Sequence, residues 1–183
     1  MSRFAVFAAG ILVFTPAMLF AQGGQGPPKR STDTSIQDFK RAMAVQAAPD
    51  QISDYQALAK NTAGAKNQAH ELQQQASAAA DATGLYKPAS TLRDAIDQVQ
   101  NDTLAFVKGF TKPQTVLLKD FTKKVSKAVS EVTKENKNLD EQVKRSAIDP
   151  KQLSDVAGRL EKVLADLQTQ QHNLADEMGV PGS

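Results

Sequence analysis

The sequence contains no cysteine and no tryptophan, and aromatic residues make up only 5% of its 183 residues. Without thiols the chain can form neither disulfide bonds nor thiolate metal sites, and no cysteine is available for a lipid anchor. Few aromatic rings argue against the stacking platforms that bind single-stranded nucleic acids. The fold must therefore depend on the packing of aliphatic side chains.

A strong charge of one sign is also missing, because 22 basic residues face 20 acidic residues and the net charge is +2. This balance gives no overall attraction to nucleic acid, so we expect no nucleic-acid partner. Alanine, glutamine, lysine and leucine are abundant, and all four have high helix propensity. The composition therefore favours an all-helical protein.

One long apolar run is present, FAVFAAGILVF, at residues 4–14. Arg3 precedes it, Pro16 interrupts its continuation and Ala21 ends it, an order that is typical of a secretory signal peptide. We expect residues 1–21 to be this signal peptide, cleaved after Ala21, which leaves 162 residues in the periplasm or outside the cell. The alternative is a retained N-terminal anchor, because the 18 residues from Phe4 to Ala21 approach the length that spans a membrane.

A Gly/Pro-rich segment follows, and we expect residues 22–34 to be a disordered linker. Ile36, Phe39 and Met43 then recur at spacings of three and four. This spacing predicts a short amphipathic helix over residues 35–47. We expect that helix to pack on the side or the end of the helices that follow.

Four longer segments repeat the same spacing, and no alternating strand pattern competes with it. They predict helices over 49–83, 89–109, 113–146 and 150–178. The residues that form a regular seam in each segment are expected to be buried. They are Tyr55, Leu58, Thr62, Ala65, Ala69, Leu72, Ala76 and Ala79; Leu92, Ile96, Val99, Thr103, Phe106 and Phe110; Leu118, Phe121, Val125, Ala128, Val132, Glu135 and Leu139; and Leu153, Val156, Leu160, Val163, Leu167, Gln170 and Leu174.

Proline and glycine mark the boundaries between the segments. Pro49 opens the first segment and Gly84 closes it, and Pro113 follows the break after the second. Asp149 and Pro150 form the clearest boundary, with Asp149 as the expected cap and Pro150 in the first helical position. We also expect the side chain of Gln152 to reach back to this cap.

Short connections between such segments indicate antiparallel neighbours. The expected fold is therefore all-α, an elongated antiparallel helical bundle of four main helices with an extra short N-terminal helix. The bundle domain is expected to span residues 35–179, followed by a flexible tail at 180–183. A helix of 34 residues would be about 50 Å long.

The residues that could carry chemistry are sparse. His70 and His172 have no partner at the spacing of a helical metal motif. Metal or haem ligation would need the two to converge from different helices, and Met178 could join His172 as a haem ligand. Most serines lie at expected caps and on helix surfaces, and no serine has a base at the spacing of a known nucleophile motif. We therefore expect no catalytic, cofactor or metal site, and a protein that is not an enzyme.

Glu135 occupies a seam position, where a lone carboxylate is costly unless it is paired. One interpretation is a drift in helical phase that turns Glu135 toward the surface. The other is a polar contact within the seam that fixes the register of the helices.

Charge is unevenly distributed along the last two segments. Residues 108–137 carry eight lysines against three acids, whereas residues 149–177 carry six acids against three basic residues. The favoured interpretation is electrostatic pairing of neighbouring helices in the bundle. The alternative is contact with an anionic surface through Lys112, Lys119, Lys123, Lys124 and Lys127, with insertion of Phe110, Leu117, Leu118 and Phe121.

The sequence therefore predicts an exported, non-enzymatic helical-bundle protein that acts through an unknown protein partner, through self-association or as a structural module. The alternative function is binding to an anionic membrane or lipid surface through the basic amphipathic segment 108–137.

Overall fold

The computed structural model describes residues 32–145 and 147–182, and this part of the chain is all-helical, as predicted. Its six helices are α1 (Thr32–Val45), α2 (Pro49–Ala78), α3 (Tyr86–Lys108), α4 (Lys112–Leu117), α5 (Lys119–Val143) and α6 (Pro150–Glu177). The expected signal peptide and residues 22–31 of the expected linker lie outside the described residues. None of the six helices has the length and apolar character needed to cross a lipid bilayer.

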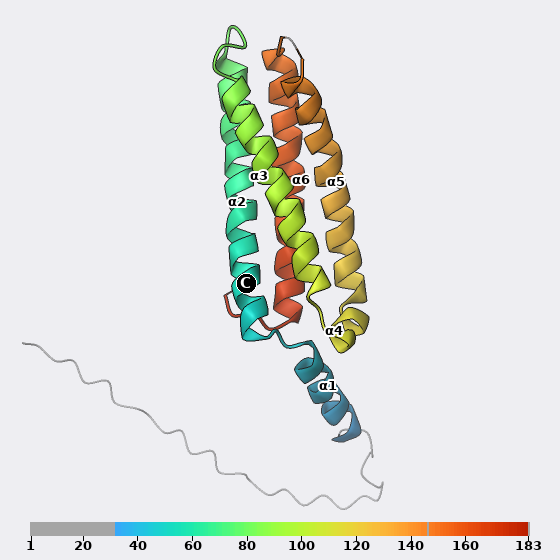
Figure 1. The fold of residues 1–183 in the computed structure, drawn as a ribbon. Coiled ribbons are helices and arrows are strands. Elements are labelled where there is room, and N and C mark those ends of the chain that lie inside the picture. Colours follow the sequence, from blue (N-terminus) through green and yellow to red (C-terminus); the bar gives the residue numbers. More distant parts are fainter. Residues whose placement is uncertain (1–31, 146, 183) are drawn as a thin grey trace, which may run out of the picture.

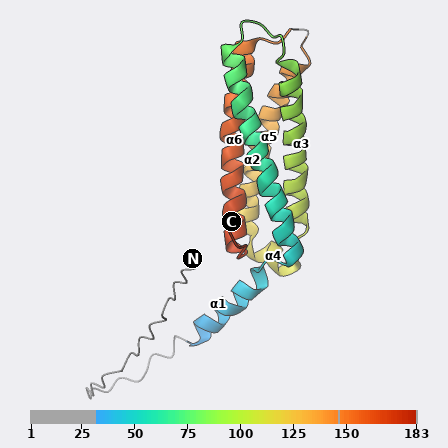
Figure 2. The same cartoon turned by 90° about the vertical axis from the view of Figure 1, so that its left-hand side faces the viewer.

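The four long helices lie side by side, and the short helices α1 and α4 lie at one end of them (Figure 1). Helix α2 packs against α3 and α6, and α5 packs against the same two helices. We call these four long helices, with α4 across their end, the body of the molecule. Helix α1 extends away from the body, as the view turned by 90° also shows (Figure 2).

The core follows most of the predicted seams. Every predicted seam residue of α2 is buried except Ala79, which lies just beyond the helix and is half-buried. In α3 the predicted seam is buried from Leu92 to Phe106, and Phe110 packs against the core from the following turn. Small residues such as Ala69 and Ala157 have no exposed surface, so α2 and α6 can approach each other closely.

The seam of α6 drifts from the predicted phase. Leu164 and Gln171 are buried where Val163 and Gln170 were expected, although Leu153, Val156, Leu160, Leu167 and Leu174 are buried as predicted. A strict seven-residue repeat has a period of 3.5, whereas a straight α-helix has a period of 3.6 and drifts about 20° per heptad. Over 28 residues this drift moves the buried face onto the neighbouring positions.

Several helix boundaries differ from the prediction. Helix α2 ends at Ala78 rather than near residue 83, and Gly84, with φ of +85°, lies in the connecting turn. Helix α3 begins at Tyr86, two residues before Pro88. Proline is tolerated there because the backbone N–H groups of a first helical turn have no acceptor within the helix, so the N–H that proline lacks costs no hydrogen bond. Helix α1 begins at Thr32, three residues before the expected start, and ends at Val45.

The single helix expected over 113–146 is two helices, α4 and α5, separated at Leu118. Leu118 has φ of −95° and ψ of 11°, and its side chain is fully buried. The Thr111 side chain caps α4 by accepting from the backbone of Gln114. The break lets Gln114 and Leu118 both face inward, so that α4 closes this end of the core.

Both ends of α6 are capped. The Asp149 side chain accepts hydrogen bonds from the backbone of Lys151 (2.9 Å) and Gln152 (3.4 Å), so the predicted cap is confirmed. The Gln152 side chain instead accepts a hydrogen bond from Arg145 at 2.7 Å. At the other end Val180 is buried and its backbone N–H donates to the Ala175 carbonyl, the pattern of a Schellman cap. The expectation that Val180 belongs to a flexible tail is therefore wrong.

Candidate functional site

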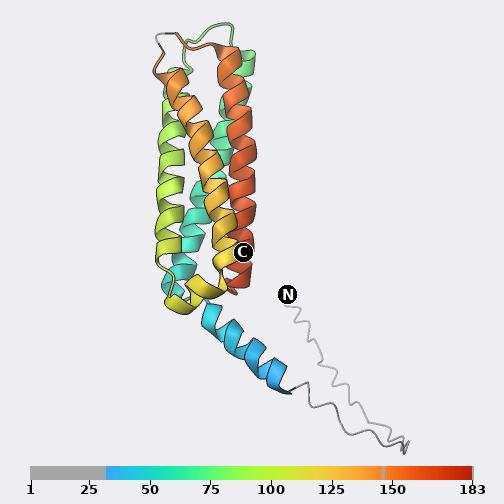
Figure 3. The ribbon, with the colours of Figure 1, turned by 90° about the vertical axis from the view of Figure 1, so that its right-hand side faces the viewer.

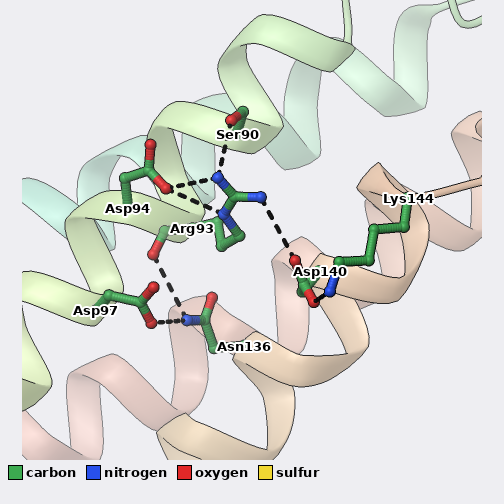
Figure 4. A network of polar contacts seen from close by, with 7 residues as sticks. All are labelled: Ser90, Arg93, Asp94, Asp97, Asn136, Asp140 and Lys144. Carbon is green, nitrogen blue, oxygen red and sulfur yellow. Dashed lines mark hydrogen bonds and ion pairs between the residues drawn. The ribbon is translucent and has the colours of Figure 1, made fainter.

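A cluster of charged residues joins α3 and α5 (Figure 4). The Arg93 guanidinium donates to Asp94 at 2.8 and 3.0 Å and to Asp140 at 3.4 Å, and Lys144 also pairs with Asp140. The hydrogen bond from Lys144 and the charge of Arg93 hold the pKa of the Asp140 carboxyl below its usual range. Figure 4 shows that these side chains converge from the two helices toward one another.

Asn136 lies at the floor of this cluster and is only 6% exposed. Its amide donates to Asp97 at 2.7 Å and to the Arg93 carbonyl at 3.5 Å. Its Oδ1 atom is buried and has no hydrogen-bond partner among the described residues. Together these residues border a hollow of about 450 Å³ between α3 and α5.

The chemistry of this hollow is that of a contact between helices. Arg93, Lys137 and Lys144 line it together with Asp94, Asp97 and Asp140, so its charges balance. The Thr133 hydroxyl, which also lines it, lies within hydrogen-bonding distance of the Gln100 Oε1 atom (3.0 Å) and of the Val129 carbonyl (2.8 Å). The cluster therefore joins α3 to α5 through paired charges and hydrogen bonds.

Glu135 lies beside the seam, and the buried seam position belongs to its neighbour Asn136. The phase drift that we considered is therefore present, but it leaves the Glu135 side chain only 12% exposed. Burial opposes its ionisation, yet hydrogen bonds from Asn138 and from Arg159 of α6 (both 2.9 Å) outweigh burial and lower the pKa of Glu135. Glu135 thus links α5 to α6 through an ion pair at the edge of the core.

The two histidines lie in separate surroundings. His70 contacts Glu161 at 3.2 Å and Gln74 at 2.8 Å, whereas His172 faces Asp176 at 3.4 Å. Met178, the possible second haem ligand, is fully buried, while the side chain of His172 is 46% exposed. Within the described ranges, no group of three potential metal ligands comes together.

The five lysines proposed to contact an anionic surface are exposed on α4 and α5. Within the part of the chain that the structure describes, none of Lys112, Lys119, Lys123, Lys124 and Lys127 forms an ion pair with an acid. Lys124 instead lies 5.7 Å from the centre of the Phe121 ring. An ion pair does join α5 to α6, but its acid, Glu135, lies on α5 and its base, Arg159, lies on α6. The charge distribution predicted the reverse, with lysines of α5 against acids of α6.

The apolar residues expected to insert into a membrane pack toward the core instead. Leu118 is fully buried, and Phe110, Leu117 and Phe121 are half-buried against the core cluster. The basic segment therefore presents its lysines to solvent, whereas the four apolar residues that were expected to anchor an interfacial helix pack toward the core.

Helix α1, which we expected to be packed, exposes two large apolar side chains on one face. Phe39 is 66% exposed and Met43 is 57% exposed, one helical turn apart. The C-terminal part of α1 is held by the body: Val45 is buried, and Gln114 donates to the carbonyls of Val45 (3.4 Å) and Gln46 (3.3 Å). One turn earlier, Arg41 pairs with Glu177 at 3.7 Å.

Sequence reasoning missed this exposed face because its spacing is the same as that of the buried seams. One local signal was present. The connector to α2 is short, and Ala48, which precedes Pro49, is extended with ψ of 158°. An extended residue before proline directs α1 away from the body, as the view from the other side shows (Figure 3).

Comparison of the chain with protein-family models, with curated proteins and with solved structures found no match. The function must therefore be argued from the chemistry of the described surfaces.

Proposed function

We propose that this chain is an exported, non-enzymatic protein, an antiparallel bundle of four helices that acts through protein–protein interaction, with α1 as its docking helix. The observation that carries the proposal is the outer face of α1, where Phe39 and Met43 are more than half exposed. A large apolar side chain gains most from burial when a partner covers it, and two on one helix face form a ready contact surface.

The length of α1 supports the same conclusion. Helices shorter than about 12–15 residues are marginal in water unless an apolar face is packed, and α1 has 14 residues. From Asp38 to Met43 every side chain is exposed. A partner on this face would supply the packing that the body does not give.

The contacts within the rest of the molecule support a role of the body as a scaffold for α1. Its charged cluster between α3 and α5 is internally paired, and Glu135 and Arg159 join α5 to α6. The apolar core is continuous through the body. A rigid, elongated scaffold that holds one docking helix at its end suits recognition better than chemistry.

Site-specific photo-crosslinking in an exporting bacterial host tests the proposal. A photoreactive amino acid replaces Phe39 in the full chain, and a matched variant carries it at the exposed Lys123 of α5. We expect a discrete cross-linked protein product at position 39 that is absent at position 123. No product at position 39, or the same products at both positions, would contradict a docking role for α1.

Binding to an anionic lipid surface is the second candidate, and the unpaired lysines favour it. Lys119, Lys123 and Lys127 recur at intervals of four along the exposed side of α5, and none has an acidic partner in the described part of the chain. Against it, acids flank this row, since Asp166 and Glu131 border the same hollow as Lys124 and Lys127. These acids would face an anionic membrane together with the lysines, and their negative charge would oppose binding.

Vesicle co-sedimentation distinguishes the two candidates. If α1 is the functional surface, binding to anionic vesicles at physiological salt should be negligible, because screening acts over about 8 Å. If the lysines are functional, binding should appear on anionic but not neutral vesicles and weaken with salt. Changing Lys119, Lys123, Lys124 and Lys127 to Gln should then abolish it, at up to about 1 kcal/mol per lysine near the surface.

A further inference from the structure

We infer that the hollow between α3 and α5 binds a small zwitterion that carries one ammonium and one carboxylate group, of the class of the free amino acids. The hollow lies on a different part of the molecule from α1, so this inference does not depend on the proposed docking role. It rests on four side chains that border the hollow and whose charges or amide atoms find no partner in the described part of the chain: Asp97, Gln100, Asn136 and Lys137.

The hollow has the size and the lining of a site for a polar ligand. Its volume of about 450 Å³ lies within the range of about 300–1,000 Å³ that is usual for small-molecule sites. Every side chain that lines it is polar or charged. Such a lining favours a small ligand with charged or hydrogen-bonding groups, because an apolar ligand would displace water from these side chains without replacing its hydrogen bonds.

The charges in the hollow balance, but their pairing is uneven. The ion pairs around Arg93 and Asp140 take up two of its three cations and two of its three acids. One acid, Asp97, and one cation, Lys137, are left, and neither belongs to an ion pair within residues 32–145 and 147–182. A ligand with one charge of each sign would complete the pairing, whereas a simple cation or anion would leave one of the two groups over.

Two buried amide atoms of the same hollow also lack a hydrogen bond. Asn136 is 6% exposed, and its Nδ2 atom donates to Asp97 at 2.7 Å while its Oδ1 atom accepts from no described residue. Figure 4 shows this oxygen turned away from Asp97, toward the space bordered by Arg93 and Asp140. Gln100 is the reverse case, because its Oε1 atom has a partner and its buried Nε2 atom donates to no described residue. Buried polar atoms without a partner are rare and costly, and these two ask for one donor and one acceptor.

The unpaired groups form one end that needs a donor and one end that needs an acceptor. Asp97 and the Asn136 Oδ1 atom are neighbours, and an ammonium group can donate to both. The Gln100 amide lies beside Thr133, and Lys137 follows Thr133 by one turn of α5. A carboxylate can accept from both Gln100 and Lys137. A free amino acid carries these two groups close together, as one small ligand between the two ends requires.

Isothermal titration calorimetry on the purified chain tests the inference. Each of the standard amino acids is titrated separately into the protein at low ionic strength, because salt screens exposed charges. We expect at least one of them to bind with one site per chain. Binding by none of them would overturn the inference.

Variants of the two unpaired charges test the location of the site. Asp97→Asn keeps an oxygen that can accept from Asn136, and Lys137→Gln keeps a polar side chain, so both should fold. Each should weaken binding by at least about tenfold, because each removes a charge-assisted hydrogen bond to the ligand. Asp155→Asn and Lys162→Gln make the same changes at exposed positions of α6 and should bind as the unchanged chain does. Unchanged affinity in either site variant, or an equal loss in the control variants, would overturn the site.

Analogues of the amino acid that binds test the chemistry of the site. The deaminated acid keeps the carboxylate and loses the cation that Asp97 would hold. The N-trimethyl derivative keeps both charges but has no N–H group to donate to the Asn136 Oδ1 atom. Both should bind at least about tenfold more weakly than the amino acid itself. Equal binding of the deaminated acid would reduce the site to a carboxylate contact at Lys137, and equal binding of the N-trimethyl derivative would exclude donation to Asn136, so either result would overturn the inference.

Discussion

Helices α1 and α6 share an amphipathic pattern but have opposite surroundings. Helix α6 buries nine residues against α2 and α5, whereas α1 buries only Val45 among its described side chains. In α6 the apolar face meets two neighbours, and in α1 the corresponding face meets solvent. Apolar spacing therefore defines which face of a helix seeks burial, but it does not say whether the partner belongs to the same chain.

The difference arises at the end of the body. Two buried amides, Gln51 and Gln114, bond to each other at 3.0–3.1 Å, and Gln114 also binds the carbonyls that follow α1. The backbone of Ala47 donates to the Met178 carbonyl at 2.9 Å. These contacts fix where α1 leaves the body and satisfy the polar groups of the connector, so α1 needs no further contact with the core.

The largest expected effect lies in α6. Leu160 has no exposed surface, so Leu160→Ala should lower the free energy of unfolding by about 2–5 kcal/mol through lost burial and the cavity left behind. Denaturant unfolding followed by circular dichroism measures it. A loss below about 1 kcal/mol would mean that α6 is not the centre of the core.

The cap of α6 should have the next largest effect. Asp149→Ala removes the side chain that accepts from the Lys151 and Gln152 backbones, and should cost about 0.5–2 kcal/mol. Asp149→Asn retains the acceptor and serves as the control. If the two variants melted alike and well below the unchanged chain, charge rather than capping would explain the effect.

A smaller effect should follow pH. Because the pKa of Glu135 in the folded protein is lowered, its stabilisation is present above the ordinary glutamate pKa of about 4.3 and is lost as the pH falls through the folded value. Glu135→Gln should therefore destabilise the protein at pH 7 and have progressively less effect in acid. Urea midpoints for the two proteins across this range test the sign, and a difference that grows in acid would contradict it.

The smallest effect should be in α1. Phe39→Ala in dilute protein should change the free energy of unfolding by no more than about 0.5 kcal/mol, as exposed positions usually do. Lys123→Ala, exposed on α5, is the matched control and should behave alike. A loss for Phe39→Ala comparable with that for Leu160→Ala would show that α1 packs on its own body.

Much of this structure follows from local sequence signals. Asp149 and Pro150 predict the start of α6, because a cap depends only on neighbouring residues. The seams of α2 and α3 follow from their spacing. The break at Leu118 was not predictable in this way, since neither glycine nor proline marks it and it depends on Gln114 reaching residues about 68 positions away.

The contacts between helices could not be predicted from spacing. Asn136 meets Asp97 across 39 residues, and Arg159 meets Glu135 across 24, and both depend on which helices become neighbours. The sequence identified Glu135 as unusual but could not supply its partner. The prediction that the lysines of α5 pair with acids of α6 failed for the same reason, because spacing alone does not show which side chains of two helices lie opposite each other.

Amide hydrogen exchange of the purified chain, followed by mass spectrometry, tests the central claim most directly. We predict that peptides covering residues 38–43, whose side chains are all exposed, exchange rapidly, while peptides around Leu160 stay protected. Protection of residues 38–43 as strong as that around Leu160 would contradict an α1 helix whose outer face is free for a partner.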